Sequence, residues 1–296
     1  MSTAVAQPAA SGMSARPIGV FDSGIGGLSI LHALQQALPG EAFVYFSDAG
    51  HAPYGERPDA FIAQRCLHIT EALIRQQGIK ALVVACNTAT TVAIHWLRQR
   101  HPDLPIIGVE PALKPALERS ASAQVAVLAT DRTLSSAKYQ ALAARMAQAY
   151  PHARIVAVPC SGLAGAIESG DVALVDTLCA RYTAQACQTA PGVDTLVLGC
   201  THYPLALEAL RRHAPTGLAF IDSAPAVARQ TRLRLGAMGL LAPQPKGWPP
   251  QPARPGLQLL GSGDVHALQA QAKRHLAHLA HVGRIGEGAQ AKGQAA

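Results

Sequence analysis

Two cysteines, Cys86 and Cys200, each follow a short apolar run and are each followed by small polar residues. The two segments read ALVVA-Cys86-Asn87-Thr88 and TLVLG-Cys200-Thr201-His202. A thiolate is a base and a nucleophile, and a helix N-terminus or a protonated histidine lowers the pKa of a thiol from about 8.5. A thiol placed in this way can form a thiolate near neutral pH. Two thiols in matched positions predict acid–base groups that face one substrate from opposite sides, with His202 as the proton partner of Cys200.

A simpler interpretation applies to each cysteine taken alone. A cysteine at the end of a buried strand is usually a small core residue, and the matched context of Cys86 and Cys200 is what favours chemistry. The remaining cysteines within helical patterns, Cys66, Cys179 and Cys187, are predicted to be buried apolar groups. Cys200 and His202 approach metal-ligand spacing, but no second pair lies nearby, so we predict no metal site.

A glycine-rich segment, Gly19–Leu28, includes Asp22 and Ser23 and connects an apolar run to a helical pattern. Such a turn places free backbone N–H groups at a helix start, where they bind anions. A dinucleotide site is an alternative, but in the G-x-G-x-x-G pattern counted from Gly24, Ser29 stands where the third glycine is expected. Asp22 would also repel a pyrophosphate. A helix cap without any catalytic role is the simplest alternative for Asp22.

Apolar runs alternate with helical patterns along the chain, which predicts an α/β fold with doubly wound, mainly parallel sheets. In such sheets the functional site lies beyond the carboxyl ends of the strands. The predicted strands span residues 17–21, 42–46, 81–85, 106–109, 125–128, 154–158, 195–198, 218–221 and 257–260. The spacing from Asp22 to Cys86 resembles the spacing from Thr130 to Cys200. This repeat predicts two pseudo-symmetric domains with the active site in the cleft between them.

The bulk properties narrow the class of protein. The chain has 296 residues, enough for about two domains, and its formal net charge is +7. The basic residues are dispersed, so nucleic acid is not required as a partner. No apolar stretch reaches the roughly 18–20 residues of a membrane span, and free cysteines are typical of the cytoplasm. We expect a cytoplasmic protein with a disordered N-terminal extension (1–15), a Pro-rich loop (242–256) and a flexible tail (283–296).

Four sequence blocks together resemble the glutamate racemases, within the aspartate/glutamate racemase superfamily. The blocks are Gly19–Leu28, Pro53-Tyr54-Gly55, Ala85–Ala89 and Gly199–Leu205. The resemblance extends from about residue 16 to about residue 280. It implies cofactor-independent interconversion of L- and D-glutamate, which supplies D-glutamate for peptidoglycan, and a homodimer. It also implies a discontinuous first domain (16–110 plus 224–282) and a second domain (111–223).

The resemblance assigns roles to residues at matching positions. Cys86 and Cys200 correspond to the catalytic thiols, with Asp22 assisting Cys86 and His202 assisting Cys200. Asp48 and Glu168 correspond to further catalytic acidic residues. The implied substrate contacts are Asp22, Ser23, Tyr54, Gly55, Asn87, Thr88, Thr130, Thr133, Thr201 and His202.

One departure from the family concerns the loop after the second predicted strand. Asp48-Ala49-Gly50-His51 replaces the commoner Asp-Thr-Ala-Arg, which bears on substrate positioning. His51 by itself is expected to be a surface-loop histidine.

Three other functions remain open from the sequence. A sister racemase acting on aspartate would use the same thiols. A thiol hydrolase or transferase would use Cys200 and His202 but leave Cys86 unexplained. A nucleotide-binding module would use the glycine-rich segment.

Overall fold

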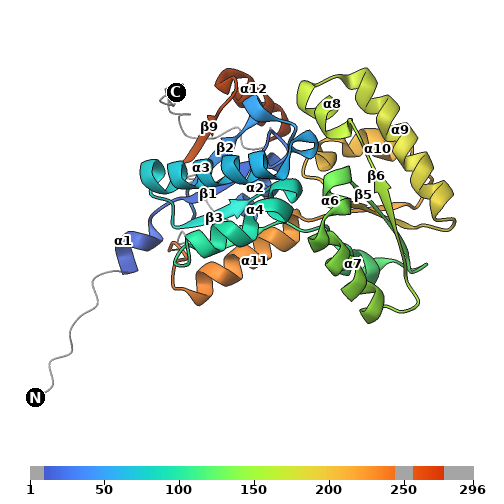
Figure 1. Ribbon diagram of the computed structural model, residues 1–296, viewed down its shortest axis with the longest axis horizontal. Coiled ribbons are helices and arrows are strands. Elements are labelled where there is room, and N and C mark those ends of the chain that lie inside the picture. Colours follow the sequence, from blue (N-terminus) through green and yellow to red (C-terminus); the bar gives the residue numbers. More distant parts are fainter. Residues whose placement is uncertain (1–9, 244–255, 277–296) are drawn as a thin grey trace, which may run out of the picture.

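The computed structural model describes residues 10–243 and 256–276, which form two parallel β-sheets with helices on both faces (Figure 1). The first sheet has the strand order β4-β3-β1-β2-β9 and the second has the order β6-β5-β7-β8. We call each sheet with its covering helices a lobe. The strands of the first lobe are β1 (Ile18–Asp22), β2 (Phe43–Ser47), β3 (Ala81–Val84), β4 (Ile106–Gly108) and β9 (Leu257–Gly261). Those of the second lobe are β5 (Gln124–Ala129), β6 (Arg154–Pro159), β7 (Thr195–Leu198) and β8 (Ala219–Asp222).

Helices cover both faces of the first sheet. On one face α3 packs against α4, and on the other α2 packs against α11. Because both faces are covered, every residue of β1 and β3 is buried, as the uninterrupted apolar runs predict. The first-lobe helices are α1 (Ala10–Ser14), α2 (Leu28–Ala37), α3 (Asp59–Gln77), α4 (Asn87–Arg100), α11 (Ala224–Ala237) and α12 (Val265–His275), with the 3₁₀ turns η1 (Ala49–His51) and η2 (Tyr54–Glu56).

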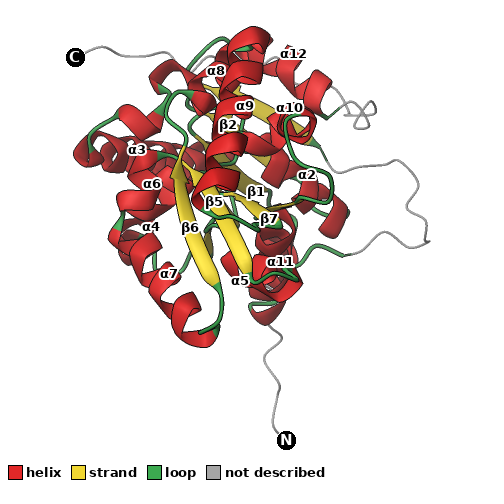
Figure 2. Ribbon diagram, turned by 90° about the vertical axis from the view of Figure 1, so that its right-hand side faces the viewer, coloured by secondary structure: helices red, strands yellow, loops and turns green. Residues whose placement is uncertain are grey.

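The second sheet is covered in the same way. Helices α8, α9 and α10 enclose one apolar core, and α5, α6 and α7 enclose the other. Figure 2 looks onto this lobe, with β5 and β6 in the foreground. Its helices are α5 (Leu113–Arg119), α6 (Asp131–Ser135), α7 (Ala137–Ala149), α8 (Leu163–Ser169), α9 (Val172–Thr189) and α10 (Leu207–Arg212), with the turn η3 (Tyr203–Ala206).

The strand order confirms the internal repeat. The order β4-β3-β1-β2 in the first sheet corresponds to β8-β7-β5-β6 in the second. In this correspondence β1 and β5 are central strands that lead into Asp22 and Thr130, while β3 and β7 lead into Cys86 and Cys200. The two thiols therefore occupy equivalent places in two similar lobes.

All nine predicted strands are present, with ends shifted by no more than two residues. The structure also places α11 and β9 with the first lobe, where α11 packs on α2 and β9 pairs with β2. The exact domain boundaries stay predictions. No helix among the described residues is both long and apolar enough to cross a membrane.

One boundary expectation is wrong. Part of the predicted disordered extension, residues 10–14, forms the short helix α1. The buried ammonium group of Lys80 donates a hydrogen bond to the carbonyl of Ser14 at 2.5 Å, which holds the end of this helix against the first lobe. The predicted tail (283–296) and nearly all of the Pro-rich loop (242–256) lie outside the described residues.

Candidate active site

Cys86 lies between the end of β3 and the first residue of α4, where it is the N-cap of the helix. Its Sγ accepts a hydrogen bond from the backbone N–H of Ala89 at 3.4 Å and lies 3.6 Å from Oγ of Ser23. Because β3 is a central strand, this arrangement buries the thiol at the carboxyl edge of the sheet. A helix N-terminus carries partial positive charge, which stabilises a thiolate.

The surroundings of Cys86 nevertheless favour the neutral thiol. Burial raises the pKa of Cys86 well above its usual value, and the nearby carboxylate of Asp22 raises it further. The hydrogen bonds from Ala89 and Ser23 act in the opposite direction but do not outweigh burial. Burial thus opposes the thiolate that a helix N-terminus would favour at Cys86, and desolvation is the larger of the two effects.

Cys200 lies directly beyond β7, next to a charged pair. Its Sγ is 3.9 Å from Nδ1 of His202, and Nε2 of His202 is 2.7 Å from a carboxylate oxygen of Glu168. Burial by itself would lower the pKa of His202, but its partners Cys200 and Glu168 raise it well above 6.5. Burial would raise the pKa of Glu168, but His202 and the N–H of Ile25 lower it. The structure thus favours a cationic imidazole beside the Cys200 thiol.

Asp22 is fully buried at the end of β1. Its Oδ2 accepts hydrogen bonds from the N–H of Gly27 at 2.6 Å and from Oγ1 of Thr201 at 3.4 Å. Its Oδ1 has no hydrogen-bond partner within the described part of the chain. Burial raises the pKa of Asp22, although the charge of His202 acts against this. Asp22 thus lies beside Cys86, and its charge depends on both halves of the site.

A pocket lies between the lobes, and both thiols line it. Its lining comprises Ser23, Ala52, Pro53, Tyr54, Gly55, Cys86, Asn87 and Thr88 from the first lobe, and Thr130, Ala164, Glu168, Cys200, Thr201 and His202 from the second. Among these residues there is no lysine or arginine. The amide nitrogen of Asn87 is buried and has no hydrogen-bond partner among the described residues. The pocket therefore offers hydroxyl and amide groups, together with the thiols, to a small ligand.

The structure brings together most, but not all, of the residues predicted from the sequence. Three of them, Asp22, Asp48 and Thr133, do not line the pocket. Thr133 lies behind its wall, with Oγ1 3.0 Å from that of Thr130 and 3.4 Å from that of Thr88. Asp48 forms an ion pair with Arg65 on the far side of Tyr54. These three residues contact groups that line the pocket.

The glycine-rich segment is occupied by side chains rather than open to a nucleotide. A Cβ atom at Gly24 would collide with the carboxylate of Glu168, and one at Gly26 would collide with His202. The backbone N–H groups of Ile25 and Gly27 donate hydrogen bonds to the carboxylates of Glu168 and Asp22, respectively. The nucleotide alternative is therefore wrong, because these carboxylates fill the space and use the donors that a phosphate would need.

Two residues that support the site lie outside the motifs recognised in the sequence. Tyr45 on β2 donates a hydrogen bond to the carbonyl of Gly24 at 2.6 Å, which anchors the glycine-rich segment. Arg65 on α3 binds Asp48 through two nitrogens. Arg65 lies between Ile62 and Ile69 at helical spacing, so a charge within an apolar stripe is the signal that could have identified it.

The fold and the site define a class of protein: a two-lobed α/β protein with paired thiols at equivalent strand ends facing one pocket. The chain belongs to the Asp/Glu/Hydantoin racemase family, which it matches over residues 18–231. It is 47% identical over 243 residues to the glutamate racemase of Pseudomonas syringae pv. tomato, covering 81% of this chain and 86% of that protein.

Solved structures agree with this assignment. Glutamate racemase isoform RacE1 from Bacillus anthracis matches with a TM-score of 0.75 and 28% identity, covering 88% of this chain and 94% of that one. Glutamate racemase from Escherichia coli, in complex with L-glutamate and the activator UDP-MurNAc-Ala, matches with a TM-score of 0.71 and 32% identity, covering 88% and 95%. The doubly wound, two-lobed fold predicted from the sequence is thus confirmed.

Proposed function

We propose that this chain is an isomerase that interconverts L-glutamate and D-glutamate by proton transfer between two thiols. The observation that carries the proposal is the placement of Cys86 and Cys200 at equivalent strand ends on the wall of one small pocket. The named relatives that cover most of this chain support glutamate as the substrate. Aspartate is the alternative substrate, and the relatives named above favour glutamate over it.

The proposed reaction needs the thiols in opposite protonation states. For L-glutamate, the Cys200 thiolate removes the α-proton, and the electron pair of the C–H bond remains on the substrate. Cys86 then donates its proton to the opposite face, which forms the new C–H bond and leaves a Cys86 thiolate. The reverse reaction starts from that state. Burial that favours the thiol form of Cys86, and a cationic His202 beside Cys200, both support this assignment.

The substrate carboxylates would be held without a direct arginine or lysine. Hydroxyl groups of Ser23, Thr88, Thr130 and Thr201 line the pocket, and the unpartnered amide of Asn87 is a further donor. Preorganised donors stabilise charge as it develops in the transition state, and do so more strongly where water is excluded. We infer that these groups, with Tyr54 and Gly55 at the pocket wall, bind the substrate.

A thiol hydrolase is the alternative that the geometry of one lobe would allow, because Cys200, His202 and Glu168 are connected in series. That function would leave Cys86 without a role on the same pocket wall. It also predicts an acyl-enzyme intermediate, which a racemase does not form.

The cellular role follows from the proposed product. D-glutamate is a component of peptidoglycan, so we propose that the enzyme supplies cell-wall synthesis in the cytoplasm. All six cysteines are free, which supports a reducing compartment. We further propose that the enzyme works as a homodimer without a cofactor. Among the described residues, no group of three or more His, Cys, Asp or Glu side chains could hold a metal ion.

The direct test is incubation of the purified, metal-free chain with L-glutamate in D₂O and a thiol reductant. Circular dichroism would follow the loss of optical activity, and NMR would follow deuterium entering at Cα. We expect both to proceed together. Activity with aspartate alone would move the assignment to a sister racemase, and inactivity with both substrates would contradict the proposal.

Substitution of either thiol tests the two-base mechanism. We expect Cys86→Ala and Cys200→Ala each to lower racemisation by at least about 10²–10⁴-fold, the usual contribution of one acid–base group. Both variants should keep the far-UV circular dichroism spectrum of the wild type. Cys187→Ala is the matched control, since Cys187 is a half-buried thiol on α9 that does not line the pocket. Full turnover by both test variants would rule out the mechanism.

A further inference from the structure

Asp48 is fully committed to neighbouring side chains. One oxygen, Oδ1, lies 2.7 Å from Nη2 of Arg65 and 3.0 Å from Nδ1 of His51. The other, Oδ2, accepts hydrogen bonds from the Tyr54 hydroxyl at 2.5 Å and from Nε of Arg65 at 3.0 Å. The side chain is fully buried and does not line the pocket. Because both oxygens are occupied, Asp48 is poorly placed to exchange protons with a substrate.

Tyr54, which donates a hydrogen bond to Asp48, does line the pocket. Tyr54 belongs to η2, and its ring packs edge-on against Phe21 with 6.3 Å between ring centroids. Both rings belong to the apolar cluster that contains Cys86. The hydroxyl of Tyr54 is directed to Asp48, so the ring is fixed at one end by a hydrogen bond and along its edge by Phe21. The position of this wall of the pocket therefore depends on Asp48.

Arg65 determines how Asp48 is held. Its guanidinium group binds both carboxylate oxygens, a planar two-point contact that a lysine cannot reproduce. The side chain is 19% exposed, so water screens the pair only weakly. We propose that Arg65 is a positioning residue of this site, which acts through Asp48 to fix the ring of Tyr54 at the pocket wall. The inference rests on the proposed function and adds a residue outside the recognised motifs.

Electrostatics support this role. Burial alone would raise the pKa of Asp48, but the hydrogen bonds from Arg65, Tyr54 and Ser262 lower it below its ordinary value. The hydrogen bond to Asp48 in turn raises the pKa of Arg65. An ionised Asp48 can only accept hydrogen bonds, so the Tyr54 hydroxyl must donate to it. Without Arg65, protonation of the buried carboxylate becomes easier, and the orientation of the Tyr54 hydroxyl is no longer imposed.

The test is a double-mutant cycle on Arg65→Gln and Tyr54→Phe, with kcat and KM for glutamate measured in each direction. Each single variant should raise KM about tenfold, because each breaks the charge-assisted hydrogen bonding that holds the Tyr54 ring at the pocket wall. The kcat should stay within about threefold of the wild type, because no proton-transfer group is removed. The double variant should be no worse than Tyr54→Phe alone, because both substitutions break the same connection.

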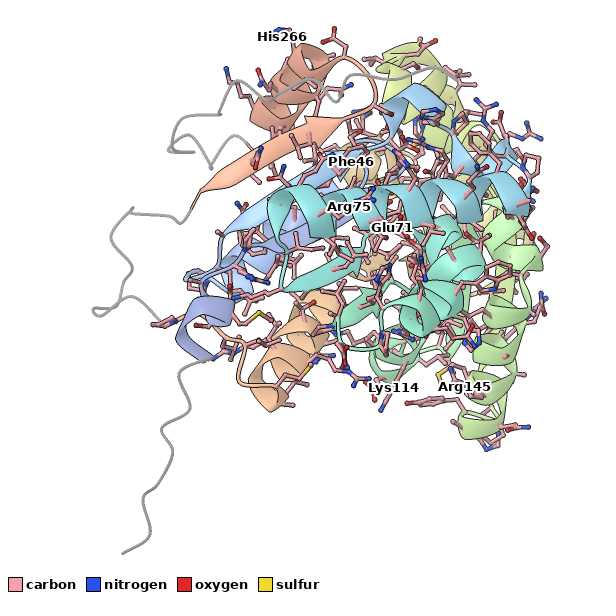
Figure 3. All side chains as sticks on the ribbon, turned by 60° about the vertical axis from the view of Figure 1, so that its left-hand side comes forward. Phe46, Glu71, Arg75, Lys114, Arg145 and His266 are labelled. Atoms are coloured by element: carbon pink, nitrogen blue, oxygen red, sulfur yellow. The ribbon has the colours of Figure 1, made fainter. Side chains whose placement is uncertain are left out.

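Two further variants separate positioning from general stability. Arg65→Lys keeps the charge but loses the two-point contact, so it should give an intermediate KM. Arg100→Gln is the matched control, since Arg100 pairs with Glu71 and neither residue lines the pocket. Glu71 lies on α3, as Arg65 does (Figure 3). This control should keep the wild-type KM. Tyr54→Phe removes only a hydroxyl group, so it keeps the test decisive even if Arg65→Gln fails to fold.

The outcomes are distinguishable. Wild-type protein that fails to racemise glutamate would contradict the proposed function itself. Active wild-type protein whose Arg65→Gln variant keeps the wild-type KM, or whose double variant shows the product of both single effects, would contradict only the inference. Loss of kcat without a change in KM in Tyr54→Phe would also contradict it.

Discussion

Cys86 and Cys200 occupy equivalent places in two similar lobes, yet the charges beside them differ. Cys86 has Asp22 as its charged neighbour, whereas Cys200 has the cationic pair partner His202. An anionic neighbour disfavours a thiolate and a cationic neighbour favours one. The asymmetry at the level of residues is therefore what a two-base reaction requires, because the thiols must begin in opposite protonation states.

Removal of Glu168 should change how activity depends on pH. Glu168 helps to raise the pKa of His202, so Glu168→Gln should lower that pKa. We expect the limb of the kcat/KM profile that reports deprotonation of His202 to move to lower pH. Racemisation assays by circular dichroism from about pH 5 to about pH 10 would measure this shift. A Glu208→Gln control on the exposed part of α10 should leave the profile unchanged. An unshifted profile in Glu168→Gln would show that the pair does not control His202.

The same pair should also contribute to stability. The raised pKa of His202 stabilises the fold below 6.5, and this contribution is lost as the pH rises through the folded-state value. The lowered pKa of Glu168 stabilises the fold above 4.5, and this contribution is lost as the pH falls through its folded-state value. Urea unfolding of Glu168→Gln should therefore show its largest deficit, about 1.5–3 kcal/mol, between those two ordinary pKa values.

At the level of elements, the turn from β1 to α2 joins the two halves of the site. It supplies N–H groups to Asp22 of its own lobe and to Glu168 of the other. Gly26 lies so close to His202 that a Cβ atom would meet both its ring and its backbone nitrogen. Backbone cannot move aside as a flexible side chain can. Gly24 and Gly26 are thus explained by close approach of the second lobe, whereas a Cβ at Gly27 would meet Asp22 and Tyr45 of the first lobe.

Gly26→Ala should therefore lower activity more than it lowers stability. The added methyl group displaces His202, and a misplacement of about 1 Å in a catalytic group can cost about a hundredfold in rate. Gly165→Ala is the matched control within α8, where a Cβ would meet nothing within 4 Å. That control should keep full activity and gain about 0.5–1 kcal/mol in the free energy of unfolding. Wild-type kcat in Gly26→Ala would contradict this account of the turn.

At the level of the whole molecule, the pocket exists because the lobes contact each other around it. Glu168 of the second lobe accepts the N–H of Ile25, and Thr88 of the first lobe lies 3.2 Å from Thr130 of the second. An ion pair between Asp59 and Arg132 adds a third contact between the lobes. Each of these contacts joins residues far apart in the sequence, and Glu168, Thr88 and Thr130 also line the pocket. Side chains of the pocket wall therefore also join the two lobes.

A buried ion pair joins distant segments elsewhere in the first lobe. Lys80 and Glu41 are 2.5 Å apart and almost fully buried, and they also bind the backbone of Ser14 and Ala242. Lys80→Met leaves Glu41 buried and unpaired, so we expect a loss of about 3–5 kcal/mol in the free energy of unfolding. The double variant Lys80→Met/Glu41→Leu should recover much of this loss in urea titrations. A loss below about 1 kcal/mol in Lys80→Met would mean that water screens the pair.

Much of the fold could be predicted from the sequence because its signals are local. Runs such as residues 81–85 are apolar without alternation, which is typical of a strand covered on both faces. The spacing from Asp22 to Cys86 is repeated from Thr130 to Cys200, which indicated two similar lobes. The position of each thiol followed from the same pattern, since each lies beyond a parallel strand at the carboxyl edge of its own sheet. The repeat then predicted that these two edges face one cleft.

Local signals alone determined the strands, the repeat and the position of both thiols at the strand ends. Tertiary structure decided the protonation preference of Cys86, the contact of Asp48 with Arg65 and the reason for glycine at position 26. The physical reason is that burial and long-range contact set these properties. Only folding brings together the residues that desolvate a thiol, pair with a carboxylate or limit the space beside a glycine.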